Sequence, residues 1–161
     1  MLRPLMFCVS LLLASAGTAH AQTNINLGGM TVDTTAAIEV TSDSLSVDQA
    51  SGRAIFDGNV IIGQGDLRLT AGKVEVIYGT DTSQIARLIA SQGVTFVTAD
   101  EAAEAQQADY DIEAGLLVLT GEVLLTQGPS AISAGQMTIN VADGTATMDG
   151  RVRTVLQQGN N

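Results

Sequence analysis

The chain is poor in the residue types on which catalysis and metal binding most often depend. Its 161 residues include one cysteine, one histidine, two prolines and no tryptophan, and aromatic residues make up only 3%. Zinc sites of the usual nitrogen and sulfur type, Ser-His-Asp triads and Cys-His pairs all require histidine or cysteine. Hydrophobic residues nevertheless make up 45% of the chain, so we expect a core of aliphatic side chains.

Positive charge is also scarce, because seven lysines and arginines stand against seventeen acidic residues. Contacts to nucleic acid and to anionic membrane surfaces depend on clustered Lys and Arg side chains. We therefore expect no nucleic-acid partner. The same composition leads us to expect no metal, no cofactor and no catalytic residues.

Residues 1–21 have the pattern of a cleavable signal peptide. Arg3 precedes an apolar run from Leu5 to Ala16, and Ala19-His20-Ala21 has the small residues of a cleavage site. The apolar run is shorter than the roughly 20 residues that a membrane span needs. Cleavage after Ala21 removes Cys8 and the single histidine, so we expect an extracytoplasmic chain without a disulfide.

Beyond the leader, the hydrophobic pattern alternates between neighbouring residues. Val74, Val76 and Tyr78 alternate with the residues between them, as is typical of a strand with one buried face. We expect a single all-β domain over residues 37–156, between a flexible polar lead-in at 22–36 and a tail at 157–161. Residues 100–108 are rich in helix formers, but their flanks resemble strands and we expect a strand there.

Residue pairs ending in glycine punctuate the pattern at short intervals and are interpreted as turns. They are Ser51-Gly52, Asp57-Gly58, Gln64-Gly65, Ala71-Gly72, Gln92-Gly93, Gln127-Gly128, Asp143-Gly144 and Asp149-Gly150.

The sequence also repeats itself. Residues 58–76 align without a gap on residues 121–139, with six identities that include Gln64/Gln127. A shorter unit, Gly-x5-Gly-x-Val, occurs three times, and its second glycines together with Gly93 recur at intervals of about 30 residues. A period of this length that holds two or three strands indicates stacked β-layers. We find no cap sequence at either end, so the end strands are expected to be open to strand addition.

Ile38 to Tyr78 resembles the OstA-like domain shared by the lipopolysaccharide transport proteins. The most telling segments there are Ser42-Asp43, Phe56 to Val60, Gln64-Gly65 and Ala71 to Val74. The resemblance covers roughly residues 36–156. It implies a β-jellyroll of stacked antiparallel strands, V-shaped in section, with open ends. The segments that extend the resemblance beyond Tyr78 are Gly93 to Phe96, Leu119 to Gly121 and Gly150 to Thr154.

A cleavable leader with nothing after the domain is similar to the soluble periplasmic member of this transport system. The resemblance then implies a bridge that carries lipopolysaccharide from the inner to the outer membrane, with the acyl chains of lipid A shielded in an apolar groove. It implies an LptC-like inner-membrane partner at the N-terminal edge and an LptD-like outer-membrane partner at the C-terminal edge. A head-to-tail homo-oligomer is also expected.

Alternation and the matching family positions indicate the groove lining. We expect Ile38, Phe96, Tyr110 and Ile112 to line it, with Thr34 near its mouth. Further inward-pointing residues are interpreted as core: Phe56, Leu67, Leu69, Val74, Val76, Leu119, Val123, Met137 and Ile139. Because the chain is acidic, we expect it to hold the lipid tails and not the phosphates of the head group.

Three other interpretations fit the same sequence. A ligand-free β scaffold that polymerises through its open edges predicts the same repeats and ends. A domain that docks to the transport system without carrying lipid predicts them as well. An enzyme would need paired carboxylates, for which Glu101/Glu104 and Asp109/Asp111 are available, although acidic pairs on strands usually face solvent.

Overall fold

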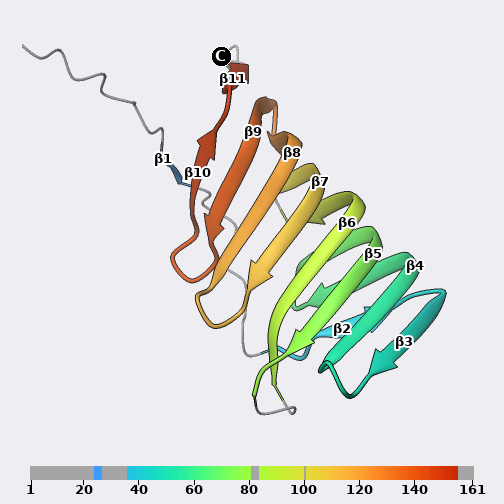
Figure 1. Ribbon diagram of the computed structural model, residues 1–161. Coiled ribbons are helices and arrows are strands. Elements are labelled where there is room, and N and C mark those ends of the chain that lie inside the picture. The colour runs from blue at the N-terminus through green and yellow to red at the C-terminus, as the bar shows by residue number, and fades with distance from the viewer. Residues whose placement is uncertain (1–23, 27–35, 81–83, 100, 156–161) are drawn as a thin grey trace, which may run out of the picture.

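The computed structural model describes residues 24–26, 36–80, 84–99 and 101–155, and eleven strands form its regular structure. Their bounds are β1 Asn24–Asn26, β2 Glu39–Thr41, β3 Ser44–Asp48, β4 Arg53–Gln64, β5 Leu67–Tyr78, β6 Ile85–Val97, β7 Glu101–Asp111, β8 Leu116–Gln127, β9 Ser130–Asn140, β10 Thr145–Asp149 and β11 Arg153–Val155. All pairings are antiparallel, and β4 to β9 lie side by side in chain order (Figure 1).

The strands β4 to β9 are long, and each contributes to two layers. The pairing register shifts near the middle of every neighbouring pair among them, which divides each strand into two halves. Layer A comprises the first halves of β4, β6 and β8 and the second halves of β5, β7 and β9; β3, β10 and β1 extend it. Layer B comprises the other halves, extended by β2 and β11. The sheet is not closed.

The folds between the layers are built from consecutive residues with positive φ in every second strand. Gly58 and Asn59 have φ of 82° and 47° in β4, and Gly121 and Glu122 have φ of 82° and 49° in β8. Gln92-Gly93 in β6 and Gly150-Arg151 after β10 have the same left-handed pair. An extra residue of this kind makes a bulge that bends the strand sharply. We call these four pairs the corners.

At the N-terminal end, Asp43 continues the row of corners. The backbone N–H of Asp43 donates to the Gly58 carbonyl (2.9 Å), and the amide of Asn59 donates to the Asp43 carboxylate (2.7 Å). At the other end, the N–H of Gly135 donates to the Gly150 carbonyl (2.8 Å). The corners at both ends of the stack are therefore hydrogen-bonded to the neighbouring strand or segment.

The corners explain how both halves of a strand bury side chains on the same side of the chain. In β5, which pairs with two corner strands but has no left-handed pair itself, Val74 and Val76 are buried in layer A and Leu69 and Ala71 in layer B, so the alternation shifts by one residue. In β4 the two corner residues leave the alternation unchanged. The two buried rows therefore face each other across the interior. The expected inward positions are confirmed, with Phe56 and Leu67 partly buried and the other seven buried.

Hairpin turns at the free side of layer A share one local design. The N–H of Ala50 donates to the Asp48 carboxylate (2.9 Å), and the corresponding bonds reach Asp111 from Ala114 (2.9 Å) and Asn140 from Ala142 (3.0 Å). A glycine with positive φ lies four residues after each acceptor, as Gly52 does after Asp48. Asx side chains and glycine favour such turns because they bond the local backbone and tolerate left-handed geometry.

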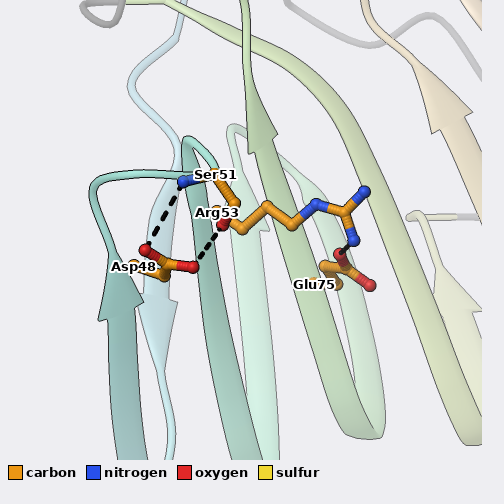
Figure 2. Close-up of polar contacts among 4 residues, drawn as sticks. All are labelled: Asp48, Ser51, Arg53 and Glu75. Atoms are coloured by element: carbon orange, nitrogen blue, oxygen red, sulfur yellow. Dashed lines mark hydrogen bonds and ion pairs between the residues drawn. The ribbon is translucent and has the colours of Figure 1, made fainter.

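Figure 2 shows the first of these turns together with a neighbouring ion pair. The Ser51 hydroxyl donates to the Asp48 carboxylate (2.7 Å), and the hydrogen bonds from Ser51 and from the Ala50 N–H lower the pKa of that carboxyl. On the outer face of layer A, Arg53 forms an ion pair with Glu75 at 2.8 Å. The turn therefore leaves its polar groups on the outside of the molecule.

The hairpin turns and the corners together account for the repeat in the sequence. In Gly-x5-Gly-x-Val the first glycine closes a hairpin turn and the second forms a corner. In the first two copies the valine is the first inward residue of layer B, whereas Val152 of the third copy is exposed between β10 and β11. Val60 and Val123 in this position are almost completely buried. The spacing from turn to corner sets a depth of about 20 Å for layer A, at roughly 3.3 Å per residue. One period of about 30 residues is therefore one hairpin of two long strands.

The interpretation of all glycine pairs as turns was wrong for half of them. Asp57-Gly58, Ala71-Gly72 and Gln92-Gly93 lie inside β4, β5 and β6, and Asp149 ends β10 with Gly150 following it at a corner. Glycine supplies positive φ to a turn and to a bulge alike. The strands from β4 to β9 are consequently longer than the spacing of the glycine pairs predicts.

The strand expected at residues 100–108 is confirmed for residues 101–108, which are part of β7, while residue 100 lies outside the described residues. Pairing with β6 and β8 overrides its helix propensity, and three of its alanines face the core. Ala103 lies opposite Phe96 on one side and Leu125 on the other. Small side chains in β7 therefore leave room for large ones in the adjoining strands.

A short strand lies within the segment that we expected as a flexible lead-in. Residues 24–26 form β1 and pair with β10, with Ile25 opposite Ala146. Figure 1 shows β1 beside β10, at the opposite end of the stack from β2 and β3. The expected signal peptide and tail, residues 1–21 and 157–161, lie outside the described residues.

Substitution of the corner glycines by alanine is expected to lower stability by different amounts at different corners. A Cβ at Gly121 would lie 2.9 Å from the Gln106 Cβ, whereas a Cβ at Gly93 would meet nothing within 4 Å, although φ is 82° at Gly121 and 80° at Gly93. We expect Gly93→Ala to lower the free energy of unfolding by about 1–2 kcal/mol. We expect Gly121→Ala to lower it by about 2–4 kcal/mol, since overpacking is added.

Urea unfolding followed by circular dichroism measures both values. Equal losses of unfolding free energy in the two variants would show that the Gln106 side chain moves aside without an energetic cost. A Gly93→Ala protein as stable as the parent would contradict the requirement for left-handed geometry at the corners.

Candidate functional site: an apolar groove between the layers

An apolar pocket lies between the two layers near the middle of the stack. Both layers contribute to it, together with the segment before β2 and the residue after β9. Its lining residues are Ile38, Ile62, Gln64, Leu67, Leu69, Leu88, Ala90, Phe96, Ala108, Tyr110, Leu117 and Val141. No residue in this lining carries a charge.

The pocket is narrow in this structure. Its free space is about 30 Å³, which is room for about one water molecule. The two facing rows of side chains are therefore close together, and a larger ligand would have to separate the layers.

Three of the five predicted groove residues meet in this pocket. Ile38, Phe96 and Tyr110 line it, coming from the segment before β2, from β6 and from β7. Ile112 packs against the hydrophobic core but is not part of the lining. Thr34 lies outside the described residues. The geometry thus brings together the two predicted aromatic positions and Ile38.

The two aromatic side chains occupy different depths. Phe96 is only 1% exposed and lies between Leu69 of β5 and Ala103 of β7 in the register of layer B. Tyr110, in layer A, is partly buried between Leu88 and Leu117, and burial raises the pKa of its phenol. Phe96 therefore forms the floor of the pocket, and Tyr110 lies nearer to solvent.

Gln64 fixes the polar rim of the pocket, a role that we did not predict from the sequence. Its side-chain amide donates to the Ala36 carbonyl (3.2 Å), which holds the segment leading to Ile38 against the end of β4. The repeat-related Gln127 donates to the buried carboxylate of Glu101. The identity of Gln64 and Gln127 in the repeat was the signal that both side chains have a local structural role.

The arginines of β4, β5 and β6 lie on the outer faces, away from the pocket, and the one buried acidic side chain among the described residues, Glu101, is not part of its lining. Arg87 pairs with Asp109 on the outside of layer A, as Arg53 does with Glu75. The guanidinium of Arg68 donates to the backbone carbonyls of Gly65 and Leu67. The lining of the pocket is therefore apolar and uncharged, and it contains no acid–base pair that could perform a reaction.

The two carboxylate pairs considered for an enzyme are placed differently: Glu101 and Glu104 lie on opposite faces of β7, whereas Asp109 and Asp111 line one depression on the outer face of layer A. Glu101 is buried against Gln127, while Glu104 is exposed on the other face of β7, and Asp109 is paired with Arg87. Within the described ranges, no three His, Cys, Asp or Glu side chains are grouped to hold a metal. The same part of the chain has no helix with the length and apolar character to cross a membrane.

The N-terminal end of the stack exposes its interior row. Leu45 and Val47 of β3 lie opposite the inward residues Phe56 and Ala54 of β4, yet they are 55% and 59% exposed. At the C-terminal end, the inward residues Ala146 and Met148 of β10 are 2% and 3% exposed. The apolar interior is therefore open at the N-terminal end of layer A.

Comparison with known proteins agrees with this architecture. The fold is similar to the crystal structure of LptH, described as the LptA-homologous periplasmic component of the lipopolysaccharide transport device of Pseudomonas aeruginosa. The TM-score is 0.71 at 16% sequence identity, over 79% of this chain and 99% of LptH. This likeness confirms the expected all-β jellyroll of antiparallel strands.

Two relatives are closer in sequence. The lipopolysaccharide export system protein LptA of Escherichia coli (strain K12) is 31% identical over 121 residues, which are 71% of this chain and 65% of that protein. An uncharacterised protein of Rhizobium meliloti (strain 1021) is 30% identical over 156 residues, which are 90% of this chain and 83% of that protein.

The family match covers residues 39–160, which include β2 to β11 and therefore both layers of the groove. The description of the family as transport proteins confirms the expectation that the chain is not an enzyme. The chain belongs to the family of LptA and the LptD N-terminal domain, the lipopolysaccharide transport proteins.

Proposed function

We propose that this protein carries lipopolysaccharide across the periplasm and shields the acyl chains of lipid A between its two layers. The observation that carries the proposal is the uncharged lining of the groove, to which both layers contribute aliphatic side chains and two aromatic ones. We propose Ile38, Phe96, Tyr110 and Ile112 as lipid contacts in the groove, with Thr34 near its mouth.

The energetics favour the tails over the head group. Burying one methylene contributes about 0.8 kcal/mol, so several methylenes outweigh the repulsion between an acidic protein and the phosphates of the lipid. Charges beyond about 10 Å are largely screened at about 0.1 M salt. The arginines described in β4 and β6 are already paired with Glu75 and Asp109 on the outer face.

Binding requires the groove to widen, because its free space is about 30 Å³. The two layers are joined along the corners, where the backbone bends at left-handed residues. On the opposite side, turns end each layer separately. An acyl chain can therefore enter by spreading the turns apart while the corners keep the strands paired.

The ends of the stack supply the proposed contacts with the rest of the transport machinery. We propose an LptC-like inner-membrane partner at β2 and β3, an LptD-like outer-membrane partner at β10 and β11, and further copies of this chain between them. Edge strands such as β2, β3 and β11 present unpaired backbone groups that accept another strand, whereas residues 145–147 of β10 already pair with β1. The exposed Leu45 and Val47 would continue the apolar interior into a neighbour.

The proposed site of action is the periplasm. Residues 1–21 have the pattern of a cleavable signal peptide, and LptH is described as a periplasmic component. We propose that residues 37–156 then fold as the lipid-carrying domain, with residues 22–36 as its lead-in.

A ligand-free scaffold that polymerises through its edges is the second candidate. The small free space between the layers favours it, since a close-packed interior needs no ligand to be stable. The two candidates differ in whether lipid reaches the groove.

Site-specific photo-crosslinking separates these candidates. Benzoylphenylalanine in place of Phe96 or Tyr110 is expected to label the acyl chains of purified lipopolysaccharide under ultraviolet light, because both positions line the pocket. The matched control is Arg68, an exposed position on β5 between the lining residues Leu67 and Leu69. A blot for lipopolysaccharide on the protein band detects the product.

Labelling at Phe96 and Tyr110 but not at Arg68 supports the carrier. If both groove positions stay unlabelled in variants with the parent's circular dichroism and unfolding curve, the lipid proposal fails. Retained end-to-end association in those variants would then favour the scaffold.

End-to-end association has a separate test at β3. We expect Val47→Glu to weaken self-association at least about tenfold, because it places a charge where a neighbour would bury an apolar side chain. Leu124→Glu is the matched control, since Leu124 is an exposed aliphatic residue in the central strand β8. Sedimentation velocity measures both. Equal association in the two variants would contradict a contact through β3.

A further inference from the structure

The C-terminal edge of layer A is occupied by the chain's own N-terminal strand. β1 pairs antiparallel with β10, with Asn24 opposite Thr147, Ile25 opposite Ala146 and Asn26 opposite Thr145. The whole stack from β2 to β9 lies between these two strands in sequence. In Figure 1, β1 lies on the outer side of β10, at the end of the strand order.

This position is also the one that a second copy would take in an end-to-end stack. Strand direction alternates through layer A from β3 to β10. A second copy's β3 added to β10 would continue the alternation, because it would run antiparallel to β10 in the same way as β1 does in the single chain. One edge therefore has two candidate strands of the same orientation.

The two candidates differ in how well they match β10. β1 is three residues long and reaches Thr145 to Thr147, so Met148 and Asp149 extend beyond its pairing. β3 has five residues, the same length as β10. Its inward residues Leu45 and Val47 are exposed and would continue the inward row of Ala146 and Met148.

We propose that β1 is an exchangeable strand that covers the β10 edge in the single protein and is displaced by β3 of a second copy when the stack assembles. The inference rests on the end-to-end stacking proposed above and adds a control to it. A covered edge keeps single molecules apart until a partner with the longer matching strand arrives.

The competition is between a short tethered strand and a longer free one. A strand on the same chain acts at an effective concentration in the millimolar range, which favours the closed pair over dilute partners. Apparent affinity for a second copy falls by the fraction of molecules whose edge is open. An edge that is open in about one molecule in ten thus weakens association roughly tenfold.

A reversible disulfide tests the exchange in the full chain. Asn24 and Thr147 lie directly opposite each other, and opposed residues of antiparallel strands have the Cα separation that a disulfide needs. The one native cysteine, Cys8, lies in the leader. We expect the double variant Asn24→Cys, Thr147→Cys to form an intramolecular disulfide and to remain monomeric when oxidised.

Reduction of the same sample should restore association, measured by sedimentation velocity over a concentration series. The variant Ile25→Pro, which disfavours pairing of β1, should associate about tenfold more strongly than the parent. Thr147→Cys alone is the control and should behave alike with and without reductant, apart from any intermolecular disulfide visible on a non-reducing gel.

Two results would overturn the proposal. One is failure of the double variant to form the intramolecular disulfide, which would show that β1 does not occupy the edge. The other is equal association of the oxidised and reduced forms, or of Ile25→Pro and the parent. Either result would show that β1 does not control end-to-end association.

Lipid binding is read out independently by photo-crosslinking at Tyr110 in the oxidised monomer. Labelling without redox-dependent association would leave the carrier proposal standing and refute the exchange. Redox-dependent association without labelling would support the strand exchange and refute the carrier proposal.

Discussion

The pair of left-handed residues at each corner is the constraint on which the rest of the structure depends. Without it, the long strands from β4 to β9 would form one extended sheet with a single buried face. The pairs in β4, β6 and β8 turn every long strand back over itself, and the strands between them follow through their pairing. The facing rows of aliphatic residues, and the groove between them, follow from that bend.

The core residues were predictable because burial on strands alternates. The division of each strand into two layers was not predictable. Alternation identifies Val74, Val76, Met137 and Ile139 as inward, and all four are buried. Glycine pairs are ambiguous because a corner and a turn make the same demand on φ. Gly52 and Gly58 differ in their pairing partners across the sheet, and a single sequence carries no record of those partners.

The candidate site was predictable to a similar degree. The scarcity of aromatic residues draws attention to Phe96 and Tyr110, and the structure places both in the pocket. Gln64 was missed because its role depends on the Ala36 carbonyl, which approaches only after the chain before β2 has crossed the end of β4. β1 was missed because so short a strand shows no periodicity, and its partner β10 lies at the other end of the chain.

The even number of strands in each repeat has a consequence for the length of the molecule. One period is a complete hairpin, so adding a period returns the chain to the same layer, with the same strand direction and the same inward faces. At about 4.8 Å between strands, a duplicated hairpin would lengthen the stack by roughly 10 Å and leave both end strands unchanged. Proteins of this architecture can therefore differ in length by whole hairpins and still join the same neighbours.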